Sequence, residues 1–167
     1  MPSSRSARPS SEAAKKSASG RPLLIHETKL RVRYSETDAQ GIVNNASYLF
    51  YFEVGRVEWL RAAGLSYKKL EEWGYGFVVV EALARYRKAA FFDDELTVRT
   101  ELVELRRASL SFGYAVLRDG ETLATGHTRH GCVKLASGRP SRVPGYVAAR
   151  VSGDLGVPPA GPDERGH

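Results

Sequence analysis

The positions of proline divide this chain of 167 residues into parts of different character. All eight prolines lie outside residues 23–139, at Pro2, Pro9, Pro22, Pro140, Pro144, Pro158, Pro159 and Pro162. Because proline lacks a backbone N–H, it interrupts helices and inner strands. A long stretch without it suits strands and helices that use every backbone donor. We therefore expect a disordered basic arm over residues 1–22, one folded domain over 23–146 and a flexible tail over 147–167. Residues 137–151 are also expected to form one short helix, with Pro144 near its first turn.

Alternation of apolar and polar residues marks several strands inside this domain. Leu30, Val32 and Tyr34 alternate with charged residues, which predicts a half-buried strand of six or seven residues. Strand-like runs also cover residues 77–87 and 95–105. A later run contains Asp119-Gly120, a dipeptide typical of tight hairpins, so we expect two antiparallel strands there.

The segment YLFYFEVGRVEWLRAA, residues 48–63, has a different pattern. Apolar side chains cover most of its first turns, which indicates a helix enclosed by other structure, and Gly64 is a natural stop. Gly55 lies mid-helix, where glycine costs about 1 kcal/mol relative to alanine, so we expect a strand to pass close to it. A strand, this buried helix and four antiparallel strands predict an α+β fold: a long curved sheet around a central helix.

Composition excludes several classes of protein. No window approaches the roughly 18 apolar residues of a membrane span. Cys132 is the only cysteine, so an intrachain disulfide and a cysteine-rich zinc site are both excluded, and we expect a reducing, cytoplasmic setting. Most of the net charge of +6 comes from residues 1–22, which carry five basic residues and one acidic residue. That arm is either a solvated leader, a nucleic-acid tether or an import segment.

A polar loop, YSETDAQGIVNNAS, precedes the aromatic helix. Asp38 and Gly41 fit the first and fourth positions of a type I turn, and Asn44 and Asn45 are residue types that cap helices. The first amides of a helix lack intrahelical acceptors and carry the positive end of its dipole. A carboxylate beside such amides can attack or activate water while the amides stabilise an oxyanion. The same residues also fit a purely structural turn and cap.

The chain resembles hotdog-fold acyl-CoA thioesterases of the 4-hydroxybenzoyl-CoA thioesterase type, which include the Tol-Pal-associated thioesterase. The resemblance starts from RVRYSETDAQGIVNNASYLFYFEVGRVEWLRAAGL, continues through ARYRKAAFFDDELTVRTELVELRRASLSFGYAV and GETLATGHTRHGCVKL, and ends with GRPSRVP. It implies a hotdog fold and hydrolysis of an acyl-CoA without metal or redox cofactor. It also implies that subunits pair their sheets, so we expect a homodimer or homotetramer with sites at the interface.

The resemblance also implies roles for individual residues. Asp38 occupies the position of the catalytic carboxylate, as nucleophile or as general base. The backbone amide of Asn45 falls where the thioester carbonyl is polarised, and Glu53 is a supporting or alternative base. Arg106 and Arg107 match a basic pair that contacts the phosphates of coenzyme A, a role that suits the planar guanidinium group.

Further substrate contacts are expected from Ile42, Val43 and Tyr48 beside the loop. No residue decides whether the acyl group is aromatic, short or long, and an acyl-carrier-protein thioester is an alternative substrate. A binding module without turnover, or nucleic-acid binding through the arm, are hypotheses from other functional classes. Glu53 has a structural alternative too, as the partner of a nearby arginine.

The chain departs from the family pattern at three positions. Ile42 and Asn45 stand where relatives carry histidine, and Ala89 replaces a proline. A mechanism that needs an imidazole in the loop is therefore excluded, so Asp38 must act largely alone or with Glu53. His127 and His130 have opposite parity in one strand, so we expect no metal site.

Overall fold

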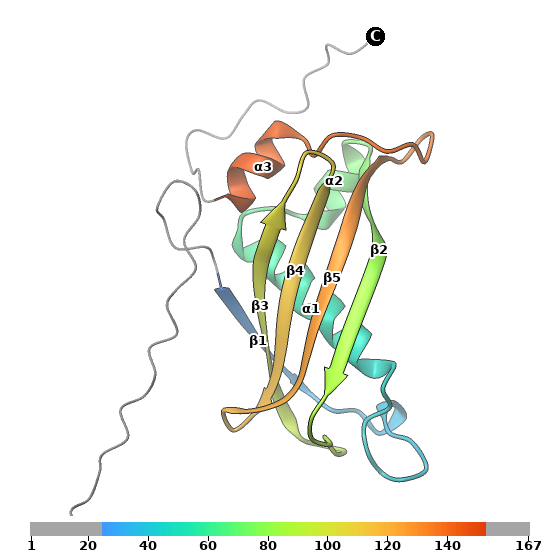
Figure 1. Cartoon of the computed structure of the whole chain (residues 1–167), viewed down its shortest axis with the longest axis vertical. Coiled ribbons are helices and arrows are strands. Elements are labelled where there is room, and N and C mark those ends of the chain that lie inside the picture. Colours follow the sequence, from blue (N-terminus) through green and yellow to red (C-terminus); the bar gives the residue numbers. More distant parts are fainter. Residues whose placement is uncertain (1–24, 153–167) are drawn as a thin grey trace, which may run out of the picture.

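The computed structural model describes residues 25–152 (Figure 1). The expectations for the arm and for the end of the tail lie outside these residues. In chain order the elements are β1 (Ile25–Arg31), the 3-10 helix η1 (Tyr34–Glu36), α1 (Ser47–Ala62), α2 (Tyr67–Glu72), β2 (Tyr75–Tyr86), β3 (Glu95–Leu105), β4 (Ser109–Arg118), β5 (Glu121–Lys134) and α3 (Gly145–Val151). Among the described residues, no helix is both long and apolar enough to cross a membrane.

The five strands form one antiparallel sheet in the order β1-β3-β4-β5-β2. The sheet curves around α1, as Figure 1 shows. The β4–β5 hairpin turns at Asp119 and Gly120, which both have positive φ, +50° and +79°. The predicted α+β architecture and the predicted hairpin are therefore confirmed.

Aromatic side chains of α1 pack on the inner face of the sheet. Phe52 and Trp59 are fully buried. Phe52 stacks on Tyr114 of β4 with ring centroids 4.5 Å apart, and Trp59 meets Phe112 edge to face at 5.3 Å. The predicted central helix is thus the main contributor to the core, through contacts in the favourable range for aromatic pairs.

Two glycines allow this close packing. A Cβ on Gly126 of β5 would lie 2.2 Å from the ring of Phe52. A Cβ on Gly55 would lie 2.4 Å from Oγ1 of Thr100 on β3. The close approach expected at Gly55 is confirmed, although the atoms nearest to it belong to strand side chains and not to strand backbone.

Both ends of the domain differ from the sequence expectation. Tyr34 lies in η1 and is 78% exposed, because the chain leaves the sheet after β1 and the ring packs on Phe92 at 5.7 Å. At the other end, residues 147–151 of the tail expected to be flexible are helical, and the short helix expected near Pro144 is present as α3. These residues belong to α3, and Val147 and Val151, one turn apart, are buried in the core.

One end of the sheet is closed and the other is open. α2 and α3 lie together at the closed end (Figure 1). There Trp73 meets Tyr146 edge to face at 4.6 Å, and Leu70 is buried. β2 ends at the open end, beside the loop that leads into α1. The predicted site residues of that loop therefore lie at the end of the sheet away from α2 and α3.

Candidate active site

The loop before α1 is a tight, internally bonded turn. The amide of Gly41 donates to the carbonyl of Asp38 at 2.9 Å, as the predicted type I turn requires, and Gly41 has a φ of +77°. The amide of Gln40 donates to Oδ1 of Asp38 at 2.8 Å, and the amide of Asp38 donates to the carbonyl of Ile42 at 2.9 Å. The loop thus holds the exposed Asp38 carboxylate through its own backbone.

The amides at the start of α1 are satisfied in turn, with one exception. Asn44 N–H donates to the carbonyl of Glu36 at 2.7 Å, and Ser47 N–H donates to the carbonyl of Asn44 at 3.0 Å. Ala46 N–H donates to the side-chain oxygens of Asn44 and Asn45, at 2.9 and 3.0 Å. The N–H of Asn45 has no acceptor among residues 25–152. The two asparagine side chains therefore accept the amide of Ala46, the residue that precedes α1, and do not cap an amide inside the helix. The amide of Asn45 is a free donor within the described residues.

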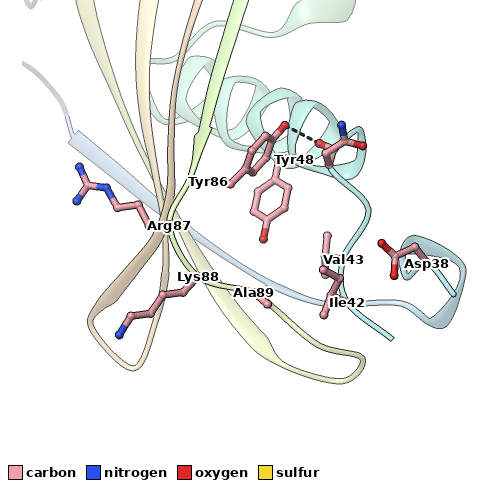
Figure 2. A pocket seen from close by; sticks show the side chains of 9 residues that line it. Asp38, Ile42, Val43, Tyr48, Tyr86, Arg87, Lys88 and Ala89 are labelled. Carbon is pink, nitrogen blue, oxygen red and sulfur yellow. Dashed lines mark hydrogen bonds between the residues drawn. The ribbon is translucent and has the colours of Figure 1, made fainter. Parts of the chain in front are cut away.

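A cavity of about 330 Å³ is lined by Asn45 and by Asp38. Figure 2 shows the side chains around it. Its volume is at the lower limit of the roughly 300–1,000 Å³ typical of small-molecule sites. The cavity brings together five of the eight residues predicted from sequence, together with four from the end of β2 and the segment after it. The lining residues are Asp38, Ile42, Val43, Asn45, Tyr48, Tyr86, Arg87, Lys88 and Ala89.

Tyrosine side chains form the wall between α1 and β2. The hydroxyl of Tyr86 donates to the carbonyl of Asn45 at 3.0 Å, and the rings of Tyr48 and Tyr86 meet edge to face at 5.1 Å (Figure 2). Burial raises the pKa of Tyr48 above its ordinary value of 10, and Tyr86 adds to that shift. Tyr48 therefore stays protonated at neutral pH and lines the cavity as a neutral group.

The residues from the end of β2 were missed by sequence reasoning. Tyr86, Arg87 and Lys88 are far from the loop in the chain, and only the unusual Ala89 marked this segment. Figure 2 shows the side chains of Arg87 and Lys88 extending away from Asp38, and Lys88 forms an ion pair with Glu121. Arg87 and Lys88 therefore border the cavity, but their charged groups lie away from Asp38.

Glu53 lies outside the cavity. It is exposed on α1, two turns beyond Asn45, or about 12 Å along the helix axis. Within the described part of the chain Glu53 forms no ion pair, since Arg56 contacts the hydroxyl of Tyr114 at 3.5 Å and Arg61 pairs with Glu58. Neither structural partner expected for Glu53 is thus engaged with it.

Arg106 and Arg107 lie at the opposite end of the sheet from the cavity. They occupy the β3–β4 turn, next to the Ser109–Gly131 pair, whereas Tyr86 pairs with Ala124. Seven residues of β5 separate these pairs, which is about 23 Å along the strand. Arg106 forms an ion pair with Glu104 at 2.8 Å. One chain therefore does not bring the arginine pair to the cavity.

A row of buried polar groups runs across the core. The guanidinium of Arg56 donates to the hydroxyl of Tyr114 at 3.5 Å, and that hydroxyl lies 2.7 Å from Oγ1 of Thr128. The same Oγ1 lies 2.8 Å from Nε2 of His130. Burial, with the positive charge of Arg56 and then His127 adding to it, lowers the pKa of His130 to about 3. His130 is therefore a neutral group of the core.

Neither the cysteine nor the metal-binding types of side chain form a second candidate site within the described residues. Cys132 is buried, and burial raises the pKa of its thiol to about 11. Across residues 25–152, no three histidine, cysteine or acidic side chains are grouped so that they could hold a metal ion.

Comparisons with known proteins agree with the fold. A family model described as "Thioesterase-like superfamily" matches residues 32–151. The acyl-CoA thioesterase YbgC of Haemophilus influenzae is 36% identical over 121 residues, which are 72% of this chain and 89% of that protein. A putative esterase of Aquifex aeolicus is 40% identical over 104 residues, 62% of this chain and 81% of that one. The crystal structure of the hypothetical protein TT1821 from Thermus thermophilus is 40% identical, with a TM-score of 0.73, covering 75% of this chain and 96% of that chain.

Proposed function

Because this chain belongs to the Thioesterase-like superfamily, we propose that it hydrolyses an acyl-CoA thioester to the free acid and coenzyme A. The observation that carries the proposal is the juxtaposition in one cavity of the Asp38 carboxylate and Asn45, whose N–H has no acceptor in the described chain. The name of the Haemophilus influenzae relative, an acyl-CoA thioesterase, supports the same reaction class.

In the proposed reaction the thioester carbonyl oxygen accepts the N–H of Asn45. Asp38 then either attacks the carbonyl carbon or activates a water molecule. In the first case the C–S bond breaks, coenzyme A leaves as a thiolate that takes up a proton, and water hydrolyses the mixed anhydride. In the second case Asp38 accepts a proton from the water as its oxygen adds to the carbonyl carbon. The C–S bond then breaks, and coenzyme A leaves as a thiolate that takes up that proton. Losing the oxyanion donor would raise the barrier by about 3 kcal/mol.

The edge strand supports the proposal that the protein is at least a homodimer. β2 is an outer strand of the sheet, and its exposed apolar side chains are Val78, Val79, Val80 and Leu83. Long apolar edges are commonly covered by another chain. A second copy paired there would bring residues of both chains near the cavity, and this is the route by which Glu53 or the arginine pair would reach substrate. Val80→Lys should weaken the dimer in analytical ultracentrifugation, and an unchanged dimer would contradict pairing through β2.

The proposed hydrolysis is tested by thiol release from aromatic, short-chain and long-chain acyl-CoA. We expect turnover on at least one class, and acyl-carrier-protein thioesters in the same assay establish whether the carrier matters. A binding module without turnover would instead raise the melting temperature with acyl-CoA and release no thiol. That second outcome would overturn the proposed hydrolysis.

A further inference from the structure

A carboxylate next to the candidate loop takes no part in the proposed reaction. Glu36 is the last residue of η1, two residues before Asp38. Its Oε2 accepts a hydrogen bond from the hydroxyl of Tyr51 at 2.8 Å and another from the amide of Arg33 at 2.9 Å. The carboxylate therefore links the chain before the loop to the helix after it.

The backbone of the same residue closes the loop. The carbonyl of Glu36 accepts the amide of Asn44 at 2.7 Å and the hydroxyl of Ser47 at 3.4 Å. The adjacent residues Thr37 and Val43 form an isolated antiparallel bridge. Both ends of the loop that carries Asp38 and Asn45 therefore meet at Glu36.

Tyr51 connects this meeting point to the rigid core. It is buried on α1, 2% exposed, and its ring meets that of Tyr48 edge to face at 5.6 Å. Burial raises the pKa of Tyr51, and the hydrogen bond to Glu36 raises it further. Tyr51 thus remains a protonated donor, and its partner ring, Tyr48, lines the candidate cavity.

Glu36 and Tyr51 themselves lie outside that cavity. They line a different one, of about 810 Å³, which shares no lining residue with it. We propose that Glu36, held by Tyr51, is a positioning residue that fixes Asp38 and the free amide of Asn45 relative to each other. This inference rests on the proposed hydrolysis, and its effect is transmitted through the loop without contact with substrate.

Two conservative variants of the full-length protein test the inference. Tyr51→Phe keeps the ring and removes the donor, and Glu36→Gln keeps the shape and removes the charge. Both should lower kcat by roughly 10- to 100-fold at a temperature well below the melting transition, with KM changed less than about twofold, because small misplacements of reacting groups are costly. The control Glu58→Gln, which breaks an exposed pair on the same helix, should leave kcat unchanged. Wild-type kcat in both test variants would overturn the proposal.

A double mutant separates positioning from general stabilisation. In an Asp38→Asn background, Tyr51→Phe should cause no further loss of rate, because the group that it positions is already removed. A full additional loss would show that Tyr51 acts independently of Asp38 and would contradict the proposal.

Hydrogen exchange at the amide of Asn44 provides a readout without turnover. Tyr51→Phe should accelerate exchange there and leave exchange in β4 unchanged. If the wild-type protein released no thiol, the proposed hydrolysis would fail, while this measurement would still test whether Tyr51 orders the loop. Unchanged exchange at Asn44 would overturn the positioning role.

Discussion

The open and closed ends of the sheet differ in what covers them. At the closed end, Trp73, Tyr146 and the buried Leu70 pack between helices and sheet. At the open end, an exposed carboxylate and a free backbone amide border a cavity. The loop at this end is held by its own hydrogen bonds and by the burial of Val43. The comparison teaches that the helix packing of the closed end and the proposed chemistry of the open end lie in separate parts of this fold.

The strongest test of that separation is Asp38→Asn at the open end. It should lower turnover by about 1,000-fold or more, roughly 4 kcal/mol of barrier, because an amide can neither attack nor accept the proton. The melting temperature should change little, since the Asp38 side chain makes only a local turn contact. Thiol release and thermal unfolding measure the two effects. A variant with near-wild-type turnover would remove Asp38 from the mechanism.

At the closed end the expected effect is on stability. Leu70→Ala should lower the free energy of unfolding by about 2–5 kcal/mol, because Leu70 is 1% exposed and truncation leaves a cavity. Denaturant titration measures the loss, and the exposed Leu49 serves as the matched control. Below the melting transition, kcat of the Leu70 variant should remain within about twofold of wild type. A large drop in kcat with unchanged stability would invalidate the separation.

Between the two ends, His130 should make stability depend on pH. Its folded pKa of about 3 lies below the ordinary value of 6.5, so unfolding takes up a proton between these values. Stability should be fully present above pH 6.5 and should fall by up to about 1.4 kcal/mol per pH unit below it, or about 2 kcal/mol by pH 5. Denaturant titrations of His130→Gln at the same pH values should show a shallower dependence. An equal slope would mean that His130 does not cause the loss.

The smallest predicted effect concerns Tyr86, which borders the cavity without reacting. Tyr86→Phe removes the hydrogen bond to the carbonyl of Asn45 and should cost about 1 kcal/mol, or fivefold in kcat/KM. The exposed Tyr34→Phe is a control for stability. A loss as large as that of Asp38→Asn would indicate that Tyr86 takes part in the chemistry.

Local sequence patterns predicted most of the fold. The run at 95–105 coincides with β3, and α1 begins and ends within one residue of its prediction. The end of β1 was missed, because alternation continues to Tyr34 although pairing with β3 stops at Arg31. Alternation reports which side chains share a face, and it cannot report where a partner strand ends.

The site was predictable only in part, for a similar reason. Asp38, Asn45 and the residues between them are close in the chain, so turn and cap patterns were sufficient to group them. Tyr86 meets Asn45 through the arrangement of β2 against α1, 41 residues away, which no local pattern encodes. The arginine pair was assigned by resemblance alone, and its distance from the cavity depends on sheet length. Glu36 is part of the loop sequence YSETDAQGIVNNAS, but no local pattern shows which hydrogen-bond donors a glutamate in a turn will meet.

The hydrogen bond from Tyr86 to Asn45 also joins the outermost strand to the proposed reaction centre. A peptide that competed with the second copy of the chain for the edge of β2 could displace that phenol without entering the cavity. Such an inhibitor would lower kcat and leave KM unchanged, which distinguishes it from a molecule that competes with the thioester for space.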